Sequence, residues 1–201
     1  KGEYGEIFDS DEDHLSITSW QSFEMENLMN SRRIVGTTLM YIFHRIENVV
    51  KNVRSAEAGP TLIVLDECWV FFENPMFAEK IKEWLKTLRK YNTAVLFATQ
   101  SLDDVAKSSI FDAVLSSCKS RIFLPDEGAR NKSRSELYRA FGLNSRQIHL
   151  LAHAQPKREY YYDSARGSRL YSLALEHCPF TLSYVSVDKA ALTKCQRILD
   201  R

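Results

Sequence analysis

The segment Thr61–Glu67 constrains the fold of this chain most strongly, because a short run of bulky apolar residues leads directly into two adjacent carboxylates. Such a run, preceded by Gly59 and Pro60, predicts a β-strand that is buried on both faces, as in a parallel sheet. Open α/β sheets bind their ligands just beyond the carboxyl ends of the strands, so Asp66 and Glu67 are expected at a ligand-binding edge. Nucleotide hydrolases use one carboxylate near a magnesium ion and another near the attacking water at this place. The segment therefore predicts an ATPase-like site.

Length and charge narrow the class of protein. The 201 residues are enough for one sizeable domain with a small appendage, and the apolar share of 44% supports a packed core. With 27 basic and 26 acidic residues the net charge is +1. This balance argues against a dedicated nucleic-acid binder, which would usually be strongly basic, although it leaves room for a local basic patch.

Cysteines and histidines give no sign of a metal site. The four cysteines are far apart in the sequence and form no CxxC pair, which favours reduced and mostly buried thiols; they are Cys68, Cys118, Cys178 and Cys195. His149 and His153 share a helical i, i+4 spacing, but no acidic third ligand lies beside them. An ordinary helix face is therefore favoured over a metal site.

The apolar runs and the first residue of the chain each carry one expectation. No segment approaches the roughly 20 apolar residues that a membrane span requires. The chain starts at Lys1 without a methionine, so we expect it to be a piece excised from a longer protein.

The pattern of apolar residues predicts a βαβ unit in the middle of the chain. Strands are expected at residues 62–66 and 94–99, with a helix at 75–90 between them. Asn74 is a plausible cap for that helix and Pro75 its first residue. Further elements are predicted as a β-rich, turn-containing lead-in over residues 1–30, helices at 33–53, 109–117, 135–141, 145–152 and from 188, and strands at 121–124, 158–162, 169–175 and 181–187.

A glutamine is predicted to join the two carboxylates. Gln100 follows the second strand of the βαβ unit, 33 positions after Glu67. If the strands are neighbours, their carboxyl ends lie roughly 5 Å apart. The amide of Gln100 offers a donor and an acceptor, so it can hydrogen-bond a γ-phosphate or the attacking water without adding charge. A strand that ends in Asp-Glu is by itself weak evidence, since such a dipeptide also caps turns, but its conjunction with Gln100 is more specific.

These segments resemble the type IV secretion and conjugative transfer ATPases of the CagE/TrbE/VirB family. Leu62–Trp69 is similar to the family's Walker B segment, and Asn92–Ser101 to its sensor-type glutamine motif. The remaining matches are residues 23–25, 41–47, 121–125 and 158–161, so the resemblance covers nearly the whole chain.

The resemblance implies an α/β fold of the RecA-like P-loop NTPase type, a three-layer fold of which this chain carries a portion without the first strand and phosphate loop. It implies one domain, with the lead-in over 1–30, core βαβ elements over 31–125, and C-terminal helices and strands over 126–201. ATP and Mg²⁺ are the implied ligands. Asp66 would hold magnesium, mainly through water, Glu67 would activate the attacking water, and Gln100 would sense the γ-phosphate.

Arg89 is similar in position to the arginine finger of related conjugative DNA-pump ATPases. The helix at 75–90 runs back across the sheet, so Arg89 should end at the edge opposite its own Asp66 and reach a phosphate only in a neighbouring subunit. A solvated cation at a helix end is nearly as good an explanation.

One expected motif is missing from the sequence. No GxxxxGK[ST] occurs, so the backbone amides and the lysine that cradle the β- and γ-phosphates are not provided. We expect this loop upstream of the chain.

A basic cluster is predicted near the C-terminal end, where Arg158, Arg166 and Arg169 surround a tight turn at Gly167. They could touch nucleotide, DNA or a neighbouring subunit, and an exposed hairpin is slightly favoured. Tyr160–Tyr162 allow base stacking, but alternating aromatic residues on a strand packed against a helix are the commoner explanation.

The sequence leaves three functions open. The first is an ATP-hydrolysing motor, a hexamer that energises pilus assembly or substrate transfer. The second is a non-catalytic docking and oligomerisation module for inner-membrane and cytoplasmic components of the secretion system. The third is a DNA-translocating motor of the same superfamily. The family implies a cytoplasmic protein at the inner face of the bacterial inner membrane.

Overall fold

The structure is a computed structural model that describes residues 12–13, 15, 18–25, 28, 32–52, 59–178, 181 and 193. The described residues form two compact units. The first is built from the described residues up to 66 together with 83–98, and the second from 67–82 together with the described residues from 99 onward.

The first unit contains the predicted βαβ connection. Strands β1 (Thr61–Leu65) and β2 (Thr93–Phe97) pair in parallel, with Thr61 opposite Thr93 and Leu65 opposite Phe97. The chain between them passes through α5 (Pro75–Thr87) and the short 3₁₀ helix η1 (Leu88–Tyr91). A parallel pair requires such a crossover. The central βαβ prediction is therefore confirmed.

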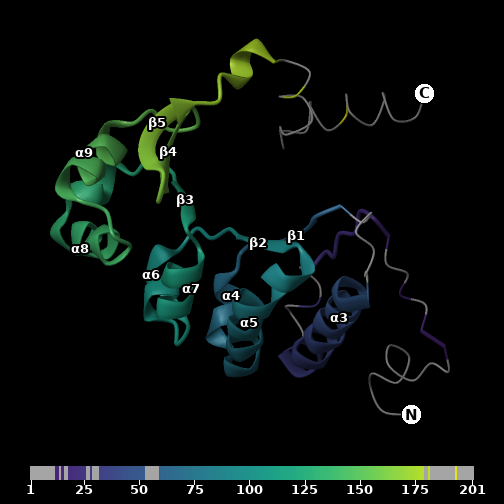
Figure 1. Cartoon of the computed structure of the whole chain (residues 1–201). Coiled ribbons are helices and arrows are strands. Elements are labelled where there is room, and N and C mark those ends of the chain that lie inside the picture. The colour runs from purple at the N-terminus through teal and green to yellow at the C-terminus, as the bar shows by residue number, and fades with distance from the viewer. Residues whose placement is uncertain are drawn as a thin grey trace. The chain divides into compact units, whose positions relative to one another are not determined.

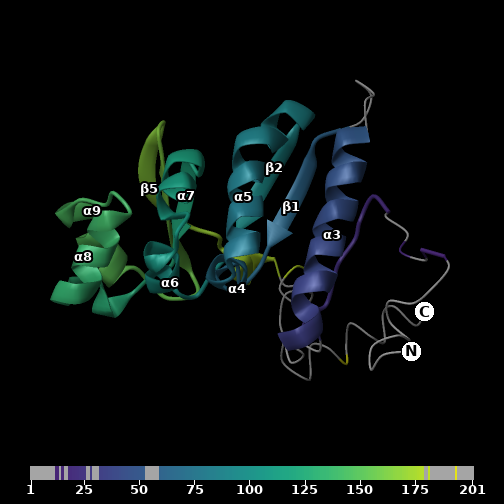
Figure 2. The same ribbon diagram turned by 90° about the horizontal axis from the view of Figure 1, so that it is seen from below.

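Helix α3 (Arg32–Asn52) and the end of α5 form the core of this unit (Figure 2). The helix predicted at 33–53 is present as α3, and its Leu39, Phe43 and Val50 are buried. The ring of Phe43 lies 4.7 Å from the ring of Trp84 on α5. Packing between the two helices thus follows from apolar residues at helical spacing.

The prediction that the Thr61–Leu65 strand is buried on both faces is wrong for the described residues. Ile63 and Leu65 are each 7% exposed, whereas Leu62 is 60% and Val64 56% exposed. Successive side chains of a strand point to opposite faces, and α3 and α5 cover only one of these. An apolar run can be buried on both faces, but whether it is depends on which other elements pack against the strand.

The second unit is a series of short helices followed by a small antiparallel sheet (Figure 1). Its further elements are α4 (Trp69–Glu73), α6 (Leu102–Lys107), α7 (Phe111–Ser117), β3 (Ser120–Phe123), η2 (Glu127–Arg130), α8 (Lys132–Ala140), α9 (Ser145–His153), β4 (Glu159–Ser164), β5 (Gly167–Ser172) and η3 (Leu175–His177). As predicted, Asn74 caps α5, because its side-chain oxygen accepts the Met76 backbone N–H at 3.0 Å.

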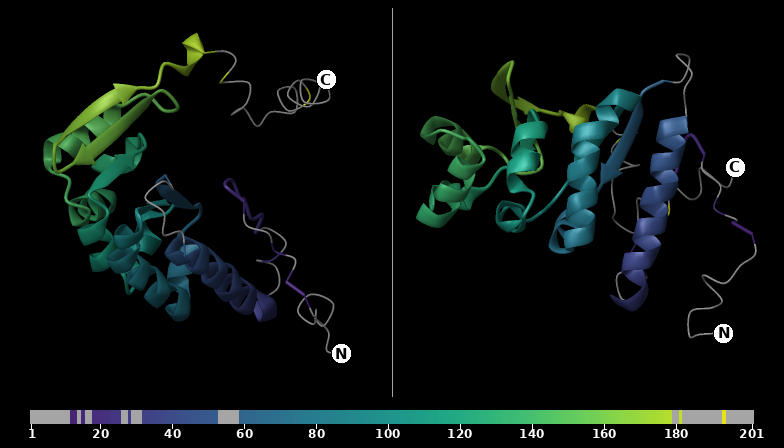
Figure 3. Two further views of the ribbon diagram at one scale, coloured as in Figure 1. Left: turned by 45° about the vertical axis from the view of Figure 1, so that its right-hand side comes forward. Right: turned by 60° about the horizontal axis from the view of Figure 1, so that its bottom comes forward.

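Strand β4 lies between β3 and β5, and α8 and α9 cover one face of this sheet (Figure 3). Tyr161 is 2% exposed and Phe123 5% exposed. The Phe123 ring lies 6.0 Å from Tyr138 and 6.4 Å from Phe141, both edge-to-face. These aromatic contacts supply the core of the second unit.

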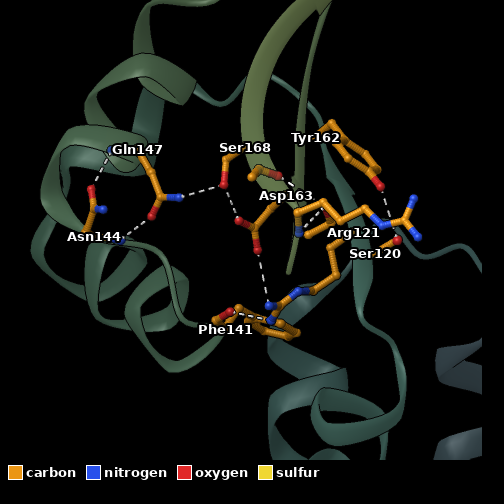
Figure 4. Close-up of polar contacts among 11 residues, drawn as sticks. Ser120, Arg121, Phe141, Asn144, Gln147, Tyr162, Asp163 and Ser168 are labelled. Atoms are coloured by element: carbon orange, nitrogen blue, oxygen red, sulfur yellow. Dashed lines mark hydrogen bonds and ion pairs between the residues drawn. The ribbon is translucent and has the colours of Figure 1, made fainter.

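A polar network ties this sheet to the two helices (Figure 4). Arg121 donates a 2.6 Å hydrogen bond to the Phe141 carbonyl and pairs with Asp163 at 3.1 Å. Ser168 donates to Asp163 at 2.6 Å, and Gln147 donates to Ser168 at 3.3 Å. Because these groups come from β3, β4, β5 and α9, they fix the register between layers as well as within the sheet.

Several short elements differ from the prediction. Helix α4 and helix α6 were not predicted, since stretches of five and six residues give too little periodicity. The short 3₁₀ helix η2 was not predicted either, and Asp126 begins it by accepting the Gly128 N–H. Both cases depend on local caps and turns rather than on a repeating pattern.

Only part of the elements predicted near the two ends of the chain lies within the described residues. Residues 18–25 of the β-rich lead-in form no strand, and Thr18 instead donates to the carbonyl of Trp20, a local bond that competes with sheet pairing. The strand predicted at 181–187 and the helix from 188 lie outside the described residues apart from single positions. None of the described helices combines the length and apolar character needed to cross a membrane.

Candidate functional site

The two carboxylates follow β1 where the strand turns into α4. Asp66 is exposed, and Glu67 is half-buried. Glu67 has φ +49°, in the left-handed region, and its carbonyl accepts the Val70 N–H at 3.1 Å. A residue with a side chain at such a φ is uncommon and costs on the order of 1 kcal/mol or more, and such strain concentrates at functional sites. The backbone thus turns sharply at the residue predicted to activate water.

Gln100 reaches Glu67, as its place after the second strand predicts. Its amide nitrogen donates to one carboxylate oxygen of Glu67, Oε1. The parallel pairing of β1 and β2 continues past the strands, because Ala98 N–H donates to the Leu65 carbonyl at 3.0 Å. The residues that follow each strand are therefore brought together, although Glu67 and Gln100 are 33 positions apart.

A turn with a hydroxyl on each side holds Gln100. Ser101 N–H donates to Thr99 Oγ1 at 3.0 Å, and the Ser101 hydroxyl accepts the Asp104 N–H at 3.3 Å. Ser101 is thereby the N-cap of α6. Gln100 is fixed between the end of β2 and the start of a helix, with its side chain exposed.

Trp69 is a site residue that the sequence did not single out. Its indole N–H donates a 2.9 Å hydrogen bond to Oε2 of Glu67. Each oxygen of this carboxylate thus has its own side-chain donor, Gln100 on Oε1 and Trp69 on Oε2. The adjacency of a tryptophan to the Asp-Glu pair was visible in the sequence, but no pattern predicts that residues two apart meet.

The carboxylate set is compatible with magnesium held in part by phosphate oxygens. Mg²⁺ prefers hard oxygen ligands and is usually bound through one or two carboxylates together with substrate phosphates. Asp66 offers such an oxygen at the end of β1. Among the described residues no group of three or more His, Cys, Asp and Glu side chains could form an all-protein cage.

Arg89 lies at the other end of the strands. It belongs to η1, and Asn92, which follows, donates to the Arg89 carbonyl at 3.3 Å and accepts the Thr61 N–H at 3.1 Å. Arg89 therefore lies beside the first residue of β1, whereas Asp66 follows the last. Five strand residues span roughly 16 Å, so the two side chains mark opposite edges of the strand pair.

A cavity of about 310 Å³ adjoins the turn that carries Gln100. Its far side holds Asp126, which accepts hydrogen bonds from Arg134 at 2.6 Å and from Tyr138 at 2.9 Å. Burial acts to raise the pKa of Asp126, but these hydrogen bonds outweigh it and hold the pKa below its usual value. Burial and the hydrogen bond to Asp126 raise the pKa of Tyr138. No sequence pattern pointed to this triad, because Asp126 caps η2 whereas Arg134 and Tyr138 lie on α8.

The basic cluster expected around Gly167 is only partly present. Arg166 and Arg169 lie at the β4–β5 turn, and hydrogen bonds from Ser120 and Ser164, followed by these two cations, lower the pKa of Tyr162. Arg158 precedes β4 and lies at the opposite end of that strand, so its inclusion was wrong. A six-residue strand separates it from the turn.

The tyrosine run alternates between the two faces of β4. Tyr161 is buried, while Tyr160 stacks on Tyr171 of β5 with ring centroids 5.8 Å apart. Packing explains Tyr161, as the sequence favoured.

The histidine pair and the described cysteines show no metal site. Arg130 lies within hydrogen-bond distance of both His149 and His153, whose rings are 4.2 Å apart. Cys68, Cys118 and Cys178 are free thiols. Cys68 is buried, Cys118 is half-buried and Cys178 is exposed, so the expectation of mostly buried thiols holds for Cys68 alone among the described cysteines. Cys195 lies outside the described residues.

Comparison with known proteins places this chain in a family. Residues 1–164 match the family model described as the TraG P-loop domain. The chain is 43% identical over 185 residues to a probable conjugal transfer protein TrbE of Sinorhizobium fredii, covering 92% of this chain and 27% of that protein. It is 44% identical over 185 residues to the conjugal transfer protein TrbE of Rhizobium radiobacter, covering 92% of this chain and 22% of that protein. The chain thus spans about a quarter of the length of these relatives.

Two further likenesses extend the comparison. The chain is 32% identical over 148 residues to the type IV secretion system protein virB4 of Bartonella quintana, covering 73% of this chain and 18% of that protein. The solved structure of VirB4 of Thermoanaerobacter pseudethanolicus matches with a TM-score of 0.53 at 16% identity, covering 65% of this chain and 34% of that chain. The family model and the structural match together confirm the predicted α/β fold class of RecA-like P-loop type. The chain therefore belongs to the TraG P-loop domain family, as a relative of the TrbE and VirB4 proteins of conjugation and type IV secretion.

Proposed function

We propose that this chain carries the water-activating half of an ATPase site in a motor of a conjugation or type IV secretion system. The observation that carries the proposal is the meeting of Glu67 and Gln100 at the carboxyl ends of two parallel strands. The names of the TrbE and VirB4 relatives support the setting.

The chemistry follows from the residue types at this edge. A water molecule attacks the γ-phosphorus, its proton passes to the carboxylate of Glu67, and the bond from the γ-phosphorus to the bridging oxygen of ADP breaks. Gln100 orients the water or the γ-phosphate through its amide. Asp66 supplies an oxygen for Mg²⁺, whose chemistry is to neutralise charge on the phosphates.

Arg89 completes the proposal at the level of the assembly. Its place beside the first residue of β1 puts it at the edge opposite Asp66. In a ring of identical subunits with head-to-tail interfaces, opposite edges of neighbouring subunits meet. Arg89 is therefore proposed to stabilise phosphate charge in trans, within a homo-oligomer of hexameric type.

The first prediction concerns Glu67→Gln in the full-length protein. The substitution removes the proton acceptor but keeps the size and a hydrogen-bonding group, so ATP turnover should fall by at least about 100-fold. Nucleotide affinity, measured by titration calorimetry with Mg-ATP, should stay within about threefold, because a water-activating carboxylate does not hold the phosphates.

Glu79→Gln is the matched control, since Glu79 is an exposed residue of α5 that pairs with Lys82 at 3.1 Å. It should leave turnover unchanged. Wild-type turnover by Glu67→Gln would refute the proposed role of Glu67.

A further inference from the structure

We propose that Trp69 is a positioning residue that holds the carboxylate of Glu67 by one oxygen and thereby presents the other to water. This inference rests on the proposed function of Glu67 as the water-activating group. Trp69 itself is not proposed to touch nucleotide or water.

The contact between the two side chains depends on the strained turn. On a regular helix, residues two apart do not face each other. Glu67 and Trp69 meet because Glu67 has φ +49°, which directs the chain through a tight turn before α4 begins at Trp69. The unusual backbone conformation and the indole–carboxylate hydrogen bond of 2.9 Å therefore belong to one arrangement.

Trp69 is well placed to impose an orientation. It is half-buried at the first position of α4, directly after Cys68, which is only 1% exposed. Helix α4 packs against α6, the helix that Ser101 caps beside Gln100. A large ring anchored in this way has little rotational freedom, whereas an unrestrained glutamate side chain rotates about three bonds.

The two carboxylate oxygens of Glu67 have different donors, and this difference suggests different roles for the two oxygens. Trp69 donates to Oε2 and Gln100 donates to Oε1. The indole has no other polar function and stays with Oε2. Gln100 can exchange its contact for a phosphate or the water, and Oε1 then becomes the oxygen that accepts the proton.

A second tryptophan shows that this pairing is not automatic. Trp84 is 1% exposed, and within the described part of the chain its indole N–H has no hydrogen-bond partner. The fold thus tolerates a tryptophan without a polar contact in its core, whereas the half-buried Trp69 makes one with the carboxylate of Glu67. Trp84 is consequently a matched control for substitutions of Trp69.

The second prediction is a kinetic test in the full-length protein. Trp69→Phe keeps an aromatic ring but removes the N–H donor, so kcat should fall about tenfold, while KM for ATP and the affinity for Mg-ATP change less than about twofold. Trp69→His, which retains a ring N–H, should recover part of the loss. Trp84→Phe makes the same chemical change elsewhere and should leave kcat unchanged.

A measurement without turnover tests the contact itself. In the nucleotide-free protein, Glu67→Ala removes the acceptor and should shift the indole emission of the wild type. In the Trp69→Phe background the same Glu67→Ala change should leave the emission unaltered. The comparison of the wild type with Glu67→Ala retains Trp69 in both proteins. It therefore tests the contact between Trp69 and Glu67 even if Trp69→Phe does not fold.

The outcomes separate the inference from the proposed function. Wild-type turnover by Glu67→Gln would overturn the function of the site. Loss of turnover in Glu67→Gln together with wild-type kcat in Trp69→Phe would overturn only the role of Trp69. An indole emission that Glu67→Ala does not change in the wild type would overturn the contact.

Discussion

At the scale of single residues, Glu67 combines a positive φ with a carboxylate that two side chains hold. Strain in the left-handed region persists only where surrounding contacts determine it. Here the indole of Trp69 and the amide of Gln100 are such contacts. The arrangement stabilises one orientation of the group that the proposed chemistry needs.

His149 gives the third prediction, which concerns pH. The positive charge of His153, then burial, then the charge of Arg130 lower the pKa of His149 below its ordinary value of 6.5. The unfolded chain therefore binds this proton more readily, so the contribution to stability is present above pH 6.5 and is lost as the pH falls through the lower folded value. His153→Ala should raise the pKa of His149 toward 6.5, and Arg130→Ala should raise it less.

A titration of ¹³C-labelled histidine followed by NMR measures these values. Substitution of His177, an exposed histidine at the end of η3, is the control and should leave the pKa of His149 unchanged. A pKa of His149 that does not move in His153→Ala would contradict the prediction.

At the scale of elements, caps decide where the short helices of the second unit begin. Asn144 and Gln147 form a reciprocal capping box at the start of α9, with hydrogen bonds of 3.0 and 2.7 Å between side chains and backbone. Gln147 also donates to Ser168 of β5. The cap thus joins the local start of a helix to the packing of that helix on the sheet.

The fourth prediction concerns Asn144→Ala, which removes the acceptor for the Gln147 N–H. Loss of an N-cap side chain costs about 1 kcal/mol of stability, so the denaturation midpoint of this unit should fall accordingly. Hydrogen exchange of the amides at the start of α9 measures the loss locally. Asn144→Asp retains an acceptor and should remain close to the wild type, whereas equal destabilisation by both changes would show that the cap is not the cause.

Strands β1 and β2 show which properties of an element a sequence pattern predicts and which it does not. The position and parallel pairing of β1 and β2 follow from apolar runs separated by a helix, and they were predictable. The exposure of Leu62 and Val64 was not, because an apolar run does not say which neighbours cover it. Helices α4 and α6 were missed since their length gives no period.

At the scale of the whole molecule, the edge that carries Asp66 and the edge that carries Arg89 lie at opposite ends of the same strands. A site that needs both groups then requires two subunits. Head-to-tail association in a closed ring supplies such an interface once per subunit. The homo-oligomer proposed above is supported by this placement.

The fifth prediction is rescue by mixed assembly. Full-length Arg89→Ala and Glu67→Gln proteins should each be nearly inactive alone. When the two are co-expressed and assemble at random, about a quarter of the interfaces pair an intact Glu67 with an intact Arg89 of the neighbour, so turnover should return in part. Turnover measured per co-purified assembly tests this, and assemblies of the double variant Glu67→Gln/Arg89→Ala with wild-type protein serve as the control. Co-assembled single variants that stay inactive would exclude action of Arg89 in trans.

The order of residues along the chain was enough to specify the βαβ unit, the position of Asp66, Glu67 and Gln100 after parallel strands, and the family. The βαβ unit and the position of the three residues rest on period, on turn residues and on the rule that parallel strands end together. The family rests on the resemblance of segments such as Leu62–Trp69. Folding in three dimensions was needed to show that Trp69 and Gln100 share the carboxylate of Glu67, that Arg158 lies away from the turn at Gly167, and that Leu62 and Val64 are exposed on β1. The reason is that side-chain contacts depend on local backbone conformations, such as φ +49° at Glu67, and on which layers pack together. Neither produces a periodic pattern of residues in the sequence.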